Sequence, residues 1–268
     1  MYSVSITFIT IPLLRHSRAP LGKKVMWAHT FFGFFSVQCP AVFYIFWLMK
    51  RIVLLFSVFL LVLNSFAQGD FEYNGIWYNY LEEDGQVEVA GSWNYNYNYR
   101  GDIVIPEIVS YGYRVTGIGR DAFRNCRNIT SVTLPASISY IGDGAFWCCE
   151  NISSVKIPEG VTRIGESAFN NCHHLDSIII PASVNSIGLR AFVSCMLTSI
   201  TVDKDNTVYD SRGNCNAIIE TETGNLILGC QNTVIPSDIK SIGDDAFGGS
   251  GITGPINIPE GVTRYCNR

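Results

Sequence analysis

The chain has 268 residues, 16% of them charged, and a formal net charge of −4. No cluster of lysine and arginine with interleaved aromatic residues occurs after residue 67, so the sequence disfavours nucleic-acid binding. The first quarter of the chain is far more apolar than the rest, so we analyse it separately.

Residues 49–67 have the three parts of a secretory signal peptide. Two basic residues precede an apolar core, and Ser65 and Ala67 occupy the small-residue positions of a cleavage site. We therefore predict that translation begins at Met49, that residues 1–48 come from a mis-assigned upstream start, and that the protein is exported.

Two apolar runs in this region, Phe31–Leu48 and Ile52–Leu63, leave a membrane anchor as the alternative. Each run is shorter than the ~20 residues that a helix needs to span a bilayer, and a Lys-Arg pair separates them. The sequence therefore predicts contact with a membrane only through the leader.

The segment 68–117 is rich in aromatic and turn residues, and we predict a β-rich N-terminal cap. The run WNYNYNY alternates with period two, which places Tyr95, Tyr97 and Tyr99 on one face of a strand. Asp102–Pro106 (DIVIP) is a further strand pattern that ends in proline. A cap over the open end of a stack of repeats is the favoured interpretation. The alternative is an aromatic platform for a sugar or a peptide.

From residue 118 the sequence repeats with a period of 23 residues, and the first three copies follow one another without gaps. The copies begin at residues 118, 141, 164, 187 and 242. Within a copy, a segment such as Ser177–Pro181 alternates apolar and polar residues, which is typical of a short strand with one buried face. The proline ends the strand because it cannot donate to a continuing ladder.

Each recurrent position of the unit has a predicted physical role. The Ile-Gly pair is expected to supply a buried anchor and a glycine with positive φ at a tight turn. The Ala-Phe pair is expected to let the coils nest, with the phenylalanines stacked along the core. Cys126, Cys149, Cys172 and Cys195 recur at one phase, where Ser250 stands in the fifth copy. A slot for a small buried residue fits that replacement, whereas a chain of disulfides does not.

These residues carry a family resemblance. The pattern I-G-x-x-A-F-x-x-C-x-x-[LI]-x-S-[IV]-x-[IL]-P, in five copies, resembles the BspA-type leucine-rich repeat family over about residues 71–262. The resemblance implies a repeat solenoid of leucine-rich-repeat type, with a parallel β-sheet on one face and short turns or helical segments on the other. It also implies presentation outside the cell, commonly in adhesion to host proteins or to other microbes.

An insertion over about 203–232 interrupts the repeats, and we predict that it contains a hairpin around Thr221–Gly224. A register that pairs Ala217 with Leu228 places Cys215 opposite Cys230. That pairing would allow a disulfide in an oxidising compartment, and two buried thiols are the equally weighted alternative.

The sequence predicts neither catalysis nor a cofactor. Catalysis needs unlike groups at one cleft, whereas repeats distribute like groups along a surface. Cys172 and His173 are adjacent, yet Cys172 has the phase of the buried cysteines. The acidic loop that contains Asp203 and Asp205 lacks the spacing of an EF-hand, so we interpret it as a solvated turn and expect no metal site.

The favoured function is binding of a macromolecule on the strand side of the repeats. One outward position per copy gives the candidate site residues, which are Thr133, Lys156, Ile179, Thr201 and Asn257. Stacked strands lie about 4.8 Å apart, so these side chains would form a row suited to a protein or a polysaccharide at the cell exterior. No small-molecule substrate is predicted. The alternatives are a structural surface spacer and a carbohydrate-binding accessory that uses the tyrosine-rich strand.

The repeat array is expected to run over 118–264. After Val262 its pattern breaks, because Tyr265-Cys266 stands where an Ile-Gly pair is due. We interpret residues 265–268 as a truncated end.

The leader prediction has a direct test in N-terminal sequencing of the exported protein. Cleavage after Ala67 predicts a mature chain that begins near Gln68. Recovery of residues 1–48 in the mature chain would contradict the prediction.

Overall fold

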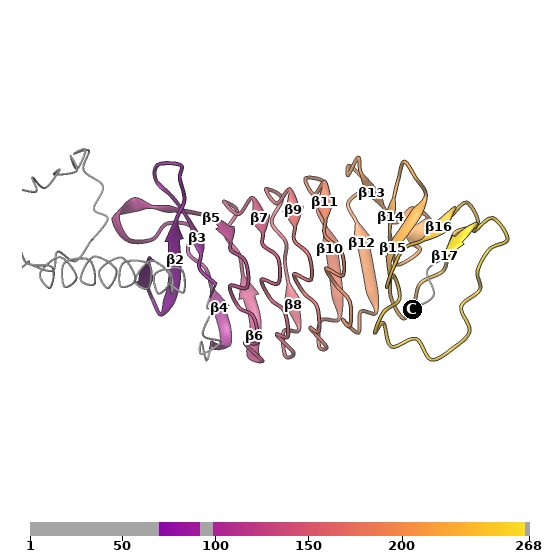
Figure 1. Ribbon diagram of the computed structural model, residues 1–268, viewed down its shortest axis with the longest axis horizontal. Helices are drawn as coiled ribbons and strands as arrows, with labels where there is room; N and C mark the ends of the chain where they lie inside the picture. Colours follow the sequence, from indigo (N-terminus) through magenta and orange to yellow (C-terminus); the bar gives the residue numbers. More distant parts are fainter. Residues whose placement is uncertain (1–69, 92–98, 266–268) are drawn as a thin grey trace, which may run out of the picture. The chain divides into compact units, whose positions relative to one another are not determined.

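The computed structural model describes residues 70–91 and 99–265, all within one of the chain's two compact units, Ser57–Arg268. The predicted leader at 49–67, and Tyr95 and Tyr97, lie outside these residues. The described residues form a stack of coils whose short strands line up in columns (Figure 1). Across 70–91 and 99–265 no helix has the length and apolar character needed to cross a membrane.

The first column of strands comes from the predicted alternating segments. Its members are β4 (Arg100–Val104), β6 (Asn128–Thr133), β8 (Ser154–Val155), β10 (Ser177–Ile180) and β12 (Ser199–Val202). β4, β6 and β8 form one parallel sheet, and β10 and β12 form another that continues the column (Figure 1). Equivalent residues stand opposite one another, as Val132 and Val155 do. The predicted strands and their 23-residue register are therefore confirmed.

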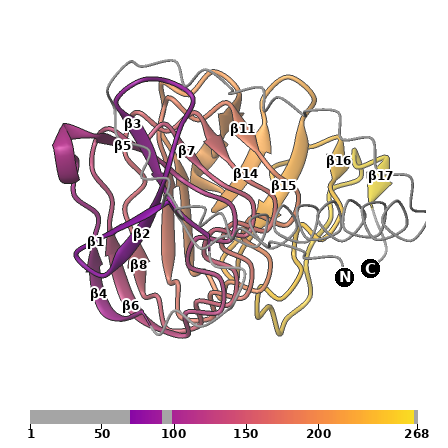
Figure 2. The same cartoon turned by 60° about the vertical axis from the view of Figure 1, so that its left-hand side comes forward.

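A second column of strands, which the sequence did not predict, runs along another side of the coils (Figure 2). It contains β1 (Phe71–Tyr73), β2 (Ile76–Tyr80), β3 (Gln86–Val89), β5 (Arg114–Ile118), β7 (Tyr140–Ile141), β9 (Arg163–Ile164) and β11 (Ser186–Ile187). β1, β2 and β3 are antiparallel, and the rest join in parallel. The antiparallel strands supply the β-rich N-terminal cap that the sequence predicts.

The glycines of the Ile-Gly pairs have a different role from the predicted one. None of these glycines has a positive φ; they are Gly119, Gly142, Gly165, Gly188 and Gly243. Instead the coils approach closely here, and a Cβ on Gly165 would lie 2.5 Å from backbone atoms of the preceding coil. The Gly165 N–H donates to the carbonyl of Ile141 at 2.8 Å. Positive φ occurs two and six residues later, at Ser167 (53°) and Asn171 (62°).

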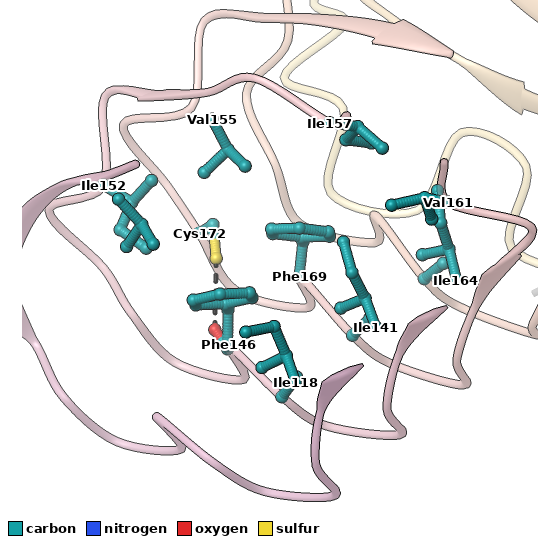
Figure 3. Close-up of a cluster of buried hydrophobic side chains, with 14 of the residues drawn as sticks. Ile118, Ile141, Phe146, Ile152, Val155, Ile157, Val161, Ile164, Phe169 and Cys172 are labelled. Carbon is teal, nitrogen blue, oxygen red and sulfur yellow. Dashed lines mark hydrogen bonds between the residues drawn. The ribbon is translucent and has the colours of Figure 1, made fainter. Parts of the chain in front are cut away.

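The phenylalanines stack as predicted through the first four copies. The rings of Phe123, Phe146, Phe169 and Phe192 are nearly parallel, with centroids 5.0–5.3 Å apart. Figure 3 shows two of them among inward-pointing isoleucine and valine side chains. Tyr99 packs edge-on against Phe123 at 5.3 Å and so covers the N-terminal end of the stack.

The insertion replaces part of a coil. β14 (Ala217–Glu220) and β15 (Asn225–Gly229) form the predicted antiparallel hairpin, within a sheet that also holds β13 (Tyr209–Asp210), β16 (Ser241–Ile242) and β17 (Arg264–Tyr265). β15 pairs in parallel with β16, so Leu226 stands opposite Ile242. The Leu226 carbonyl accepts the Gly243 N–H at 2.8 Å, as the Ile141 carbonyl does from Gly165. Two 3₁₀ turns, Ser110–Gly112 and Arg212–Asn214, complete the described elements.

The predicted register of the hairpin is wrong by one residue at its open end. Ile219 pairs with Leu226 as predicted, but a bulge after Ile218 places Ala217 opposite Gly229 instead of Leu228.

The two cysteines of the insertion consequently point to opposite sides of the ribbon. Cys215 packs with Ala217, Ile219 and Leu226 in a small C-terminal core, whereas Cys230 belongs to the main core. Both are free, buried thiols, which was the alternative to the disulfide.

Truncation of one stacked ring tests the core. Phe169 is fully buried between Phe146 and Phe192, so Phe169→Ala should lower the free energy of unfolding by about 3–5 kcal/mol. Urea denaturation measures this change, with the exposed Glu159→Ala as a control that should stay near wild type. An unchanged denaturation midpoint for Phe169→Ala would show that the stack does not carry the core.

Candidate binding surface

The five residues predicted to point outward from the strands are all exposed. Ile179 is 63% exposed although its neighbours in β10, Ile178 and Ile180, are buried. It stands directly opposite Thr201 of β12. The pleat of a strand sends successive side chains to opposite faces, so Ile179 belongs to the solvent face.

The structure adds one residue to this row and separates another from it. Val104 of β4 is 65% exposed and stands opposite Thr133, so it begins the row. The DIVIP pattern contains this residue and would have predicted its place. Asn257 is exposed, but its segment forms no strand, and no backbone bond joins it to β12 in the described chain. We define the outer row as Val104, Thr133, Lys156, Ile179 and Thr201.

Hydroxyl groups form a second outward column beside the outer row. Ser131 stands opposite Ser154, and Ser177 stands opposite Ser199. At the N-terminal end Ser131 donates to the Asp102 carboxylate at 2.6 Å, and Thr130 donates to it at 2.8 Å. These hydrogen bonds hold the pKa of Asp102 below its ordinary value. The face is therefore polar, with exposed apolar side chains at its first and fourth positions and Lys156 between them.

The four recurrent cysteines are buried thiols, and three of them donate hydrogen bonds to the preceding coil. Cys172 Sγ lies 3.2 Å from the Phe146 carbonyl oxygen (Figure 3), and Cys149 and Cys195 repeat this geometry at 3.0 Å. A hydrogen bond with the neighbouring Cys195 and burial raise the pKa of Cys172, which favours the thiol over the thiolate.

The adjacent His173 is exposed, and its Nδ1 lies 3.0 Å from the Ser194 carbonyl oxygen. Cys172 faces the core instead, so the two side chains do not form a nucleophile and base.

The polar side chains of the acidic loop in the insertion bind other groups of the protein. Asp203 accepts the N–H of Asp205 at 2.9 Å. Arg212 bridges Asp210 at 2.6 Å and Asp238 at 2.7 Å, which ties the insertion to the segment before β16. These contacts are those of a structural turn.

Of the three tyrosines proposed as an aromatic platform, Tyr99 packs within the N-terminal cap. The Tyr99 hydroxyl accepts the Trp77 N–H at 3.4 Å, and the ring packs on Phe123. Tyr95 and Tyr97 lie outside the described residues.

Stacked coils of 23 residues, parallel strand columns and a stacked aromatic core define a leucine-rich-repeat solenoid. The chain belongs to the BspA type leucine rich repeat family, which it matches in six copies over residues 96–217 and 226–268. The match begins before the first copy recognised in the sequence and includes β4.

Solved structures of bacterial leucine-rich repeat proteins are similar to this chain. One from Bacteroides ovatus is 26% identical with a TM-score of 0.53, and the match covers 73% of this chain and 55% of that one. One from Eubacterium ventriosum is 23% identical with a TM-score of 0.46, covering 72% and 60%. The chain thus spans little more than half the length of these relatives. Among curated proteins no significant match is found.

Proposed function

We propose that this protein is a non-catalytic, extracellular binding protein that presents the outer row to a macromolecular partner, either a protein or a polysaccharide. The observation that carries the proposal is the exposure of the row side chains on one face, in register from β4 to β12. Export is supported by the signal-peptide pattern of residues 49–67 and by the surface role that the family resemblance implies.

The chemistry of the outer row suits an extended partner. Five strands about 4.8 Å apart present a row of about 20 Å, longer than a single sugar or amino-acid residue. Ile179 offers an exposed apolar contact on a polar face, beside Lys156 and the serine column. We expect Lys156 and Ile179 to contribute most of the affinity, because interfaces concentrate their energy in a few residues.

Two other functions remain alternatives. In a structural surface spacer no face would be dedicated to a ligand, and substitutions on the outer row would change nothing. A carbohydrate-binding accessory would instead rely on Tyr95 and Tyr97, since Tyr99 is engaged in the cap.

A paired substitution tests the outer row. Lys156→Glu with Ile179→Asp should weaken binding to host matrix proteins or to a glycan array at least tenfold, because both side chains leave the sheet away from the core. The matched control is Lys240→Glu with Val234→Asp, which makes the same charge change at exposed positions outside the row. Circular dichroism checks that each variant is folded.

The tyrosine variants separate the alternatives. Tyr95→Ala with Tyr97→Ala should leave binding intact if the outer row is the site. Loss of binding in this variant, with retention in the paired outer-row variant, would move the site to the tyrosine-rich segment. Retention in both would contradict the outer row as the binding site.

A further inference from the structure

The fourth coil, which begins at Ile187, lacks a stacking hydrogen bond that the earlier coils share. In those coils the phenylalanine N–H donates to the alanine carbonyl of the next coil, as Phe169 does to Ala191 at 2.7 Å. The corresponding acceptor for Phe192 would be the carbonyl of Ala246. That carbonyl accepts the N–H of Gly229 in β15 instead, at 2.8 Å.

Two more backbone groups of the fourth coil also lack the partners that their equivalents in earlier coils have. The Ser167 N–H donates to the Leu189 carbonyl one coil on, but the equivalent N–H of Arg190 has no partner among the described residues. By the pattern of the earlier coils, the Ile187 carbonyl would accept the N–H of Gly243. That N–H donates to the Leu226 carbonyl instead. Within the part of the chain that the structure describes, two donors and one acceptor of the fourth coil therefore have no backbone partner.

The three residues that carry these groups all line one crevice. Its volume is about 100 Å³, and its walls include Ile187, Arg190 and Phe192 of the fourth coil, Ile227 and Leu228 of β15, and Asp245 of the fifth. Figure 1 shows β15 in the stack between β11 and β16. Phe192 is only 2% exposed, and a buried N–H without a partner is destabilising unless water or a ligand satisfies it. The volume exceeds that of one water site several-fold.

The lining selects a neutral group that both accepts and donates hydrogen bonds. An anion would meet the carboxylates of Asp244 and Asp245 and the Ile187 carbonyl. A cation would meet two N–H donors and the Arg190 guanidinium, which pairs with Asp245 at 2.7 Å. A secondary amide avoids both conflicts, since its carbonyl can accept from the two N–H groups and its N–H can donate to Ile187.

We propose that this crevice binds the acetamido group of an N-acetylated amino sugar. The methyl group would contact the apolar walls at Ile227 and Leu228 while the amide satisfies the three backbone groups. A peptide amide offers the same polar atoms, but its chain continues on both sides, whereas an acetamido group ends in a methyl that a small crevice can enclose. No residue of the outer row lines the crevice. The binding proposed for the crevice therefore does not depend on the function proposed for the outer row.

Titration of the full chain with tri-N-acetylchitotriose tests the proposal, with cellotriose as the matched sugar that lacks the acetamido group. Calorimetry should give an affinity at least tenfold higher for the acetylated trimer. Saturation-transfer NMR should show the strongest enhancement at its acetyl methyl protons. Ile227→Phe, which fills the crevice from a half-buried position, should weaken binding at least tenfold. The paired Lys240→Glu and Val234→Asp variant, which alters exposed positions outside both the crevice and the outer row, should bind as wild type does.

Absence of binding would overturn the proposal and leave water as the only occupant of the crevice. Equal affinity for cellotriose would overturn it as well, as would full binding by a folded Ile227→Phe variant. If that variant does not fold, the methyl enhancement in the wild-type protein and the preference over cellotriose decide the result.

Discussion

The close approach of successive coils at the Ile-Gly pairs is the constraint on which the rest of the structure depends. In the first four copies the glycine N–H donates to the preceding coil at a distance that leaves no room for a Cβ, as at Gly142, Gly165 and Gly188. The same spacing brings the phenylalanine rings to about 5 Å and places the thiols of Cys149, Cys172 and Cys195 against carbonyls of the preceding coil. This spacing of the coils also sets the register of the strand columns and of the outer row.

The insertion shows what happens when another element takes over this contact. Leu226 of β15 accepts the glycine N–H of the fifth coil, so the strand column continues although the repeat pattern is interrupted. The hairpin has two buried faces and divides the core, with Ile218 on the main side and Ile219 on the C-terminal side. Its strand matches only part of a coil, and the unmatched part leaves the backbone groups around Phe192 open.

The sequence predicted what depends on side-chain periodicity. Alternation around Ile179 identified a strand and its solvent face, and the fixed phase of Phe169 and Cys172 identified their burial. The second column of strands was not predicted, because strands of two residues, such as Tyr140–Ile141, have no detectable period. The role of Gly165 was misjudged because glycine serves both positive φ and close approach, and only the stacked coils distinguish them. The bulge after Ile218 has no sequence signal, so the cysteine register was also missed.

The stability of a glycine-to-alanine variant at the coil contact tests this constraint most directly. In Gly165→Ala the new methyl meets the preceding coil, and overpacking of this kind costs about 1–3 kcal/mol. Gly261→Ala is the matched control, since its Cβ would lie 3.5 Å from the nearest atom and the substitution restricts the unfolded chain. Urea denaturation should show a clear loss of stability for Gly165→Ala and none for Gly261→Ala. A Gly165→Ala protein as stable as wild type would contradict the claim that close coil contact at the Ile-Gly pairs determines the fold.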